Sequence, residues 1–134
     1  MTDTGKKKDT KKGTEKAAEK DVIVIHEIAS EVEAHLRDKY ATRIAEGRLK
    51  RATLDMDENG KERLEVALLV PSRTTQDEFM KYVDKDPGKA KKILVRNCLV
   101  TNIDQVNNND YLFETCVNAI AELFTIGAHE VKNF

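Results

Sequence analysis

The chain has 134 residues, of which 35% are charged and 40% are apolar, and its formal net charge is −1. This length and balance suit one small globular domain, and no apolar run approaches the roughly 20 residues that a membrane helix needs. The N-terminal lysines have no apolar stretch behind them, so we expect no secretory signal there. Cys98 and Cys116 lie far apart in the sequence. We expect them to be buried thiols in a reducing compartment, not a disulfide or a zinc site.

Residues 1–20 form a segment that is nearly free of large apolar side chains. Seven lysines outnumber the acids in it, whereas the remainder of the chain is mildly acidic. This composition predicts a disordered basic tail. Nucleic-acid binding is an alternative reading of the lysines, but no arginine or aromatic residue is interleaved with them, so the pattern favours a solvated tail.

Residues 21–134 are predicted to form a single α+β domain, in which a β-hairpin packs with about four α-helices. The first predicted element is a long amphipathic helix over residues 22–46, which Gly47 ends. Its apolar stripe recurs every three to four residues and consists of Ile25, Ile28, Val32, Leu36, Tyr40 and Ile44. Such a helix either packs across the whole domain or reaches out to a partner. The β-branched start, residues 22–25, leaves a short strand open as an alternative.

A β-hairpin is predicted over residues 49–70. Two runs in it alternate between apolar and polar side chains, and the turn between them contains Asn59-Gly60. Alternation with a period of two is typical of half-buried strands, and Asn-Gly is a frequent hairpin turn. Pro71 ends the second strand because it has no N–H to donate.

The rest of the chain is predicted to be helical, over residues 74–85, 87–99 and 110–126. Thr75 and Glu78 have the spacing of a capping box at the first of these helices. Asp86 can cap the second, with Pro87 at its first position. Asn109 or Asp110 can cap the third, and Gly127 is a candidate for its end. The polar residues 101–110 are expected to form a loop.

The stretch DMDENG, residues 55–60, resembles the start of an EF-hand calcium loop. An EF-hand needs a bidentate acid at its twelfth position, which here is Val66, and the acid Glu65 comes one residue early. The flanks also have the pattern of strands, not of helices. We therefore interpret DMDENG as a hairpin tip, whose residues tolerate positive φ and exposure to water.

Catalytic motifs are also incomplete. HEIAS, residues 26–30, has Ser30 where a zinc-protease helix has its second histidine, and His35 is out of phase with His26 on a helix. The two cysteines fall on predicted apolar helix faces, where a thiol behaves as a small hydrophobe. We accordingly expect no enzyme activity, no cofactor and no metal site.

The order of the elements from residue 49 to residue 134 resembles that of bacteriophage tail assembly chaperones. In this shared order a hairpin leads into a Pro-x-Arg step, here Pro71-Ser72-Arg73, and then into a helix and a short Asp-rich break. The next helix ends in a stretch similar to Leu94–Cys98, and a polar loop leads to a final helix that opens with Asp110-Tyr111-Leu112. The chain before residue 48 lies outside the shared pattern, and the loop after Cys98 lacks a Gly-Asp step.

The resemblance implies a chaperone in the cytoplasm of the infected bacterium, without cofactor or catalysis. Its client would be the phage tape-measure protein, and in some cases also the tail-tube protein. A structural component of the virion and a nucleic-acid-binding module acting through the lysine tail stay as alternatives, and pairing of the long helix with a second copy is open. We single out Arg73, Phe79 and Tyr82 as candidate partner-binding residues. Alternatively, Arg73 forms an internal ion pair or a helix cap, and the two aromatic rings belong to the core.

Overall fold

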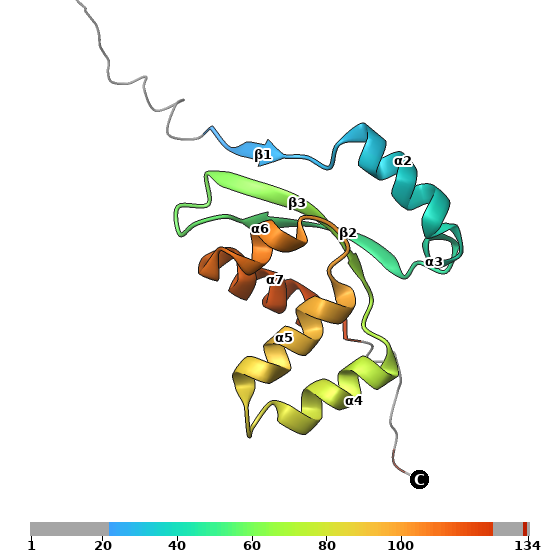
Figure 1. The fold of residues 1–134 in the computed structure, drawn as a ribbon, viewed down its shortest axis with the longest axis vertical. Helices are drawn as coiled ribbons and strands as arrows, with labels where there is room; N and C mark the ends of the chain where they lie inside the picture. Colours follow the sequence, from blue (N-terminus) through green and yellow to red (C-terminus); the bar gives the residue numbers. More distant parts are fainter. Residues whose placement is uncertain (1–21, 125–132, 134) are drawn as a thin grey trace, which may run out of the picture.

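The computed structural model describes residues 22–124 and 133, and its fold is α+β (Figure 1). Its three-stranded sheet has the order β1-β3-β2. The strands are β1 (Val24–His26), β2 (Leu49–Asp55) and β3 (Glu62–Leu69). Six helices occur in this part of the chain: α2 (Ser30–Lys39), α3 (Ala41–Ala45), α4 (Arg73–Tyr82), α5 (Pro87–Cys98), α6 (Ile103–Asn107) and α7 (Asp110–Glu122). The predicted basic tail, residues 1–20, and the candidate stop Gly127 lie outside the described residues.

The predicted hairpin is confirmed. β2 and β3 pair antiparallel, with Leu54 opposite Leu64. Of the alternating apolar side chains, Leu54, Leu64, Val66 and Leu68 are buried, and Ala52 and Met56 are partly buried against the same core. At the tip, the Asp57 carboxylate accepts hydrogen bonds from the backbone N–H groups of Asn59 and Gly60, at 3.0 and 3.2 Å. Gly60 takes the positive φ of +67° that the turn requires, because glycine adopts this conformation without a steric cost.

The core lies between the inner face of the hairpin and the C-terminal helices. Figure 1 shows α5, α6 and α7 gathered on one side of the sheet, with α4 beside α5. The largest fully buried side chains of these helices are Leu94, Cys98, Val106, Leu112, Cys116 and Ile120, and they form one cluster with the inward side chains of the strands. The cluster fixes the helices against the sheet because burying such side chains is the main favourable term in folding.

The helix starts follow from their caps. Asp86 and Asn109 cap α5 and α7 as predicted, accepting from the N–H groups of Lys89 and Leu112. The predicted capping box at Thr75 is wrong, because Ser72 is the N-cap of α4 and accepts from the N–H of Thr75 at 3.1 Å. Consequently α4 begins and ends earlier than the predicted 74–85. The predicted 87–99 and 110–126 correspond to α5 and α7, which end at Cys98 and Glu122.

The expected loop over residues 101–110 contains a short helix, α6. Val106 is fully buried in the core cluster, and one helical turn brings it there. Asn102 precedes the helix with a left-handed backbone, at φ 56°, a conformation that asparagine adopts more readily than most residues. The helix was not predicted from the sequence because its residues are mostly polar, and a single buried side chain is enough to fix so short an element.

The predicted long helix over residues 22–46 is wrong. Its start forms β1, which pairs parallel with β3 through Val24, Ile25 and His26. The later part is split at Tyr40, whose backbone at φ −111° and ψ 27° is not helical and separates α2 from α3. Gly47 follows α3 with a positive φ of +71°, and the chain stops being helical there, as predicted. The β-branched run favours a strand because its branched side chains pack well on a pleated surface, and β3 offers it an edge.

Candidate protein-binding surface

The surface with the most exposed apolar residues lies at the start of the described chain. Val22, Ile23, Val24 and Ile25 are each between 46% and 56% exposed, and we call these four residues the apolar edge. Val22 and Ile23 precede β1, and Val24 and Ile25 are its first two residues. β1 is the outermost strand on one side of the sheet. An exposed and uncharged edge strand is a template for pairing with another chain. The opposite edge strand, β2, carries Lys50 and Arg51, and such charged side chains hinder pairing of an edge strand with another chain.

The backbone of the apolar edge has hydrogen-bonding groups to offer. The N–H of Val24 donates to the carbonyl of Lys61 at 2.7 Å, so this residue faces β3. Backbone groups of neighbouring strand residues point to opposite edges, so those of Ile25 point away from β3. Over the part of the chain that the structure describes, no strand pairs with that side of β1. The geometry therefore suits the addition of one extended segment.

β1 covers only the beginning of β3. Beyond the Leu64 pairing, the chain leaves the sheet and the segment after α5 takes over the same edge, where the Val100 N–H donates to the Ala67 carbonyl at 3.0 Å. The Thr101 hydroxyl accepts the Ala67 N–H at 3.0 Å. Two segments that are distant in sequence thus share one edge of β3, which limits β1 to three paired residues.

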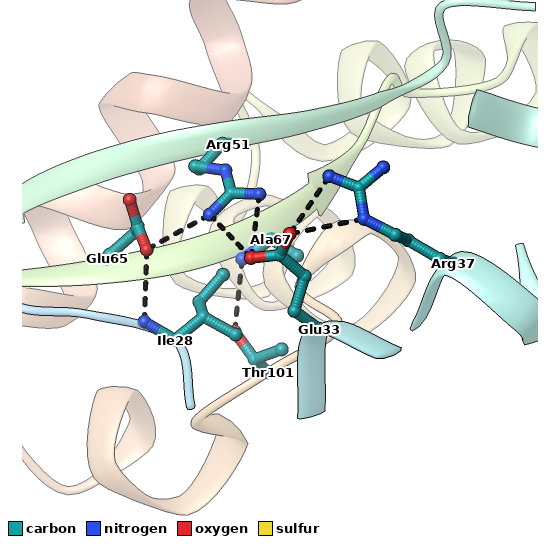
Figure 2. Close-up of polar contacts among 7 residues, drawn as sticks. All are labelled: Ile28, Glu33, Arg37, Arg51, Glu65, Ala67 and Thr101. Carbon is teal, nitrogen blue, oxygen red and sulfur yellow. Dashed lines mark hydrogen bonds and ion pairs between the residues drawn. The ribbon is translucent and has the colours of Figure 1, made fainter. Parts of the chain in front are cut away.

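A polar network fastens the chain after β1 to the outer face of the sheet (Figure 2). The Glu65 carboxylate on β3 accepts the backbone N–H of Ile28 at 3.0 Å and lies 3.3 Å from the guanidinium of Arg51 on β2. Arg51 also reaches Glu33 on α2 at 3.2 Å, and Arg37 donates to Glu33 at 2.9 Å. The network therefore connects α2 with both strands of the hairpin.

The network shifts two pKa values in opposite directions. Hydrogen bonds from Arg37 and then from Arg51 lower the pKa of Glu33 below its ordinary value. The hydrogen bond with Glu33 raises the pKa of Arg51 above its ordinary value. Both shifts favour the charged forms, because each charge has an opposite charge beside it.

α2 and α3, residues 30–45, are held lightly against the sheet. We call these two helices the arm. Leu36 is the one residue of the arm that is buried. A small cavity of about 160 Å³ lies beneath, lined by both apolar residues such as Leu36, Ile44 and Ala67 and charged residues of the polar network. The mixed lining of this cavity and the single buried residue of the arm indicate that few side-chain contacts hold the arm against the sheet.

Arg73, singled out from the sequence, is exposed at the first residue of α4. It lines an open pocket of about 430 Å³ together with Arg48, Gln76 and Asp77. Within residues 22–124 it makes no ion pair, and the N-terminus of α4 is capped by Ser72 instead. The internal ion pair considered for Arg73 is therefore not formed with a described residue.

The two rings singled out lie elsewhere. Phe79 is half-buried and packs edge-on against Phe124, with ring centroids 5.4 Å apart, so it belongs to the margin of the core. Tyr82 is half-buried at the last residue of α4, and the Lys89 ammonium lies 4.2 Å from its ring centroid. Arg73 and Tyr82 are thus at opposite ends of α4, and the structure does not bring the three residues together as one site.

The motifs that resemble metal or catalytic sites have structural explanations. At the hairpin tip, Asp55 pairs with Arg63 at 3.0 Å and Asp57 caps the turn. His26 ends β1 and so lies on a strand, not on a helix. No group of three or more His, Cys, Asp or Glu side chains suited to a metal ion occurs among the residues that the structure describes.

Cys98 and Cys116 are free and buried, as predicted. Burial raises the pKa of Cys98 to about 11 and that of Cys116 to about 12. At neutral pH both are therefore thiols, whereas the thiolate is the reactive form.

Among the described helices, none is both long enough and apolar enough to cross a membrane. Comparison of the chain with protein-family models, with curated proteins and with solved structures finds no match in any of the three. The candidate surface rests on its geometry, because residues 22–25 lie outside the region of the sequence resemblance. Sequence reasoning noted the β-branched run at residues 22–25 but did not single it out as a binding surface, although an uncharged run of this kind was the available signal.

Proposed function

We propose that this chain is a non-enzymatic protein-binding module that serves as a phage tail assembly chaperone and holds the tape-measure protein in the host cytoplasm until the tail is assembled. The sequence resemblance over residues 49–134 supports the family. The apolar edge lies before the resembling region, and it supports the activity because it offers a place for an extended segment of a client.

The observation that carries this proposal is the exposure of Val22, Ile23, Val24 and Ile25 together on an edge strand. Isolated apolar residues on a surface are common, but contiguous ones are typical of sites of protein interaction. A client chain that is not yet assembled exposes backbone and apolar side chains, and strand addition satisfies both at once. Such binding is reversible, since the pairing covers one short strand.

Co-expression tests the proposal. The full chain is produced together with a tape-measure protein of the same phage, and the soluble and co-purifying amounts of that client are measured. We expect the wild-type chain to keep the client soluble and to co-purify with it. The double substitution Ile23→Lys and Ile25→Lys is expected to abolish most of this binding, because two charges cannot be buried in an apolar strand interface without a partner.

The double substitution Met80→Lys and Tyr111→Lys is the matched control, because it also adds two charges at exposed large hydrophobic residues, at 62% and 41%, but these lie on α4 and α7. It should leave co-purification unchanged. A client that stays insoluble with the wild-type chain, or one that binds both variants equally well, would contradict the proposal.

Mass spectrometry of purified phage particles distinguishes a chaperone from a structural component of the virion. A chaperone leaves when assembly is complete, so the chain should be absent from particles and present in the infected-cell lysate. Its presence in particles at a fixed stoichiometry would favour the structural alternative.

A further inference from the structure

A second feature of the surface is an open groove of about 420 Å³ between α5 and α6. Its apolar lining consists of Val95 and Leu99, which are buried beneath it, and Ile103, which is 49% exposed at the start of α6. The left-handed backbone at Asn102 directs the chain into α6 immediately before Ile103. The fold therefore places a large aliphatic side chain at the groove and leaves half of it in water.

The rim of the groove is positively charged. Lys92 and Arg96 line it from α5, and no acidic side chain of the described residues lines it with them. Within the same residues neither cation forms an ion pair. They are four residues apart on one helix, so they are neighbours on its surface and repel each other. By contrast, Lys91 on the same helix is neutralised by Glu114 at 3.0 Å.

The chemistry of the groove identifies its occupant. An aliphatic floor takes an apolar side chain, and two cations on the rim without partners take carboxylates beside it. A single-stranded nucleic acid fits this surface less well, because its bases stack on aromatic side chains and the lining contains none. A second copy of the chain would need a larger surface, since stable interfaces bury roughly 800 Å² per partner.

We propose that this groove binds an acidic segment of the client, with one large aliphatic or aromatic residue seated between Val95, Leu99 and Ile103 and with Asp or Glu residues paired to Lys92 and Arg96. The identity of the client rests on the proposed chaperone function. The groove and the apolar edge are separate surfaces on separate elements, so each can be changed without the other.

Nuclear magnetic resonance locates the binding directly. The ¹⁵N-labelled full chain is titrated with a synthetic peptide that places leucines among aspartates and glutamates. We expect the largest changes of chemical shift at the backbone amides of α5 and α6 that surround the groove. A matched peptide with Asn and Gln in place of the acids should bind much more weakly, and so should one with Ser in place of the leucines.

Three variants test the named residues by fluorescence anisotropy with the same peptide. Arg96→Glu is expected to weaken binding about tenfold, which is the scale of one lost charge pair. Ile103→Ser is expected to weaken it severalfold through the lost apolar contact. Lys85→Glu is the control, because Lys85 is exposed, lies outside the groove and makes no ion pair with a described residue. It changes the net charge equally and should have little effect.

The possible results separate this inference from the proposed function. Shift changes at β1, an equal loss in Lys85→Glu and Arg96→Glu, or displacement of the peptide by an oligonucleotide would overturn the groove as a site for acidic segments. An altered self-association of Arg96→Glu without any peptide binding would overturn it in favour of a second copy. If the acidic peptide binds as expected while the tape-measure protein does not co-purify, the groove stands and the chaperone function fails.

Discussion

At the scale of single residues, Thr101 links two segments that are far apart in sequence. Its hydroxyl accepts the N–H of Ala67 at 3.0 Å, and the residue is 8% exposed. Valine would fill the same space but leave this N–H without a partner. We expect Thr101→Val to lower the free energy of unfolding by about 1–3 kcal/mol, the cost of one unsatisfied buried donor.

Urea denaturation measures this loss. Thr101→Ser keeps the hydroxyl and should retain most of the stability, so it separates the hydrogen bond from the packing of the methyl group. A loss in Thr101→Ser without a loss in Thr101→Val would instead assign the stability to the methyl group.

The charge on Glu33 predicts a dependence of stability on pH. Arg37 and Arg51 lower the pKa of Glu33 in the folded chain below its ordinary value of 4.5. A lowered pKa stabilises the fold at every pH above the ordinary value, and the contribution is lost as the pH falls through the folded pKa. The difference in unfolding free energy between wild type and Glu33→Gln should therefore be largest near neutral pH and shrink below pH 4.5.

Urea titrations from neutral to acidic pH check this expectation. The effect should be small and should weaken with added salt, because the pair is exposed to solvent. Glu58→Gln is the control, since Glu58 lies exposed at the hairpin tip and has no ion pair among the residues described. A difference that is constant with pH would show that the Glu33 charge does not stabilise the fold.

At the scale of elements, the arm differs from α5 and α7 in how little of it is buried. Leu36 is its one buried residue, whereas α5 and α7 bury five and four residues. Segments with few buried apolar contacts open locally without global unfolding. We expect Leu36→Ala to speed hydrogen exchange in α2 and α3 while leaving exchange in α5 and α7 unchanged.

Hydrogen exchange followed by mass spectrometry measures each segment separately. Leu94→Ala is the contrasting variant, because Leu94 belongs to the main core and its loss creates a cavity there. That change should speed exchange throughout the chain. If Leu36→Ala also did so, the arm would be part of the cooperative core.

The elements also show what the sequence can predict. The hairpin was predictable because a period of two over two adjacent runs is a local signal, and the caps at Asp86 and Asn109 are local as well. The strand at the start of the described chain could be left open only as an alternative to a helix, because it depends on the free edge of β3, about 40 residues further along the chain. The stripe from Ile28 to Ile44 fitted a helix in period, but only the structure shows the break at Tyr40.

At the scale of the whole molecule, the two proposed binding surfaces follow from which faces the fold covers. The C-terminal helices cover the inner face of the sheet, the arm covers part of the outer face, and β1 stays at the margin (Figure 1). The sequence shows which residues are apolar, but exposure depends on this arrangement. For this reason Phe79 was singled out from the sequence although it packs against Phe124, while Ile103 was not, although half of it is exposed.

The uncovered margin has a consequence for the free protein. An apolar edge strand without a charge tends to pair with another copy, so we expect the wild-type chain to self-associate as its concentration rises. Ile25→Lys places a charge on this edge and should suppress the association. It should change the free energy of unfolding by no more than about 0.5 kcal/mol, as is usual for a surface substitution.

Sedimentation velocity over a series of concentrations measures the association, and Met80→Lys again provides the matched change of charge. If Met80→Lys suppresses association as strongly as Ile25→Lys, net charge is responsible and not the edge strand. If Ile25→Lys alone suppresses it, self-association uses the strand edge that we propose for the client. In that case added client should dissociate the assemblies of the wild-type chain, because a strand edge accepts one partner at a time.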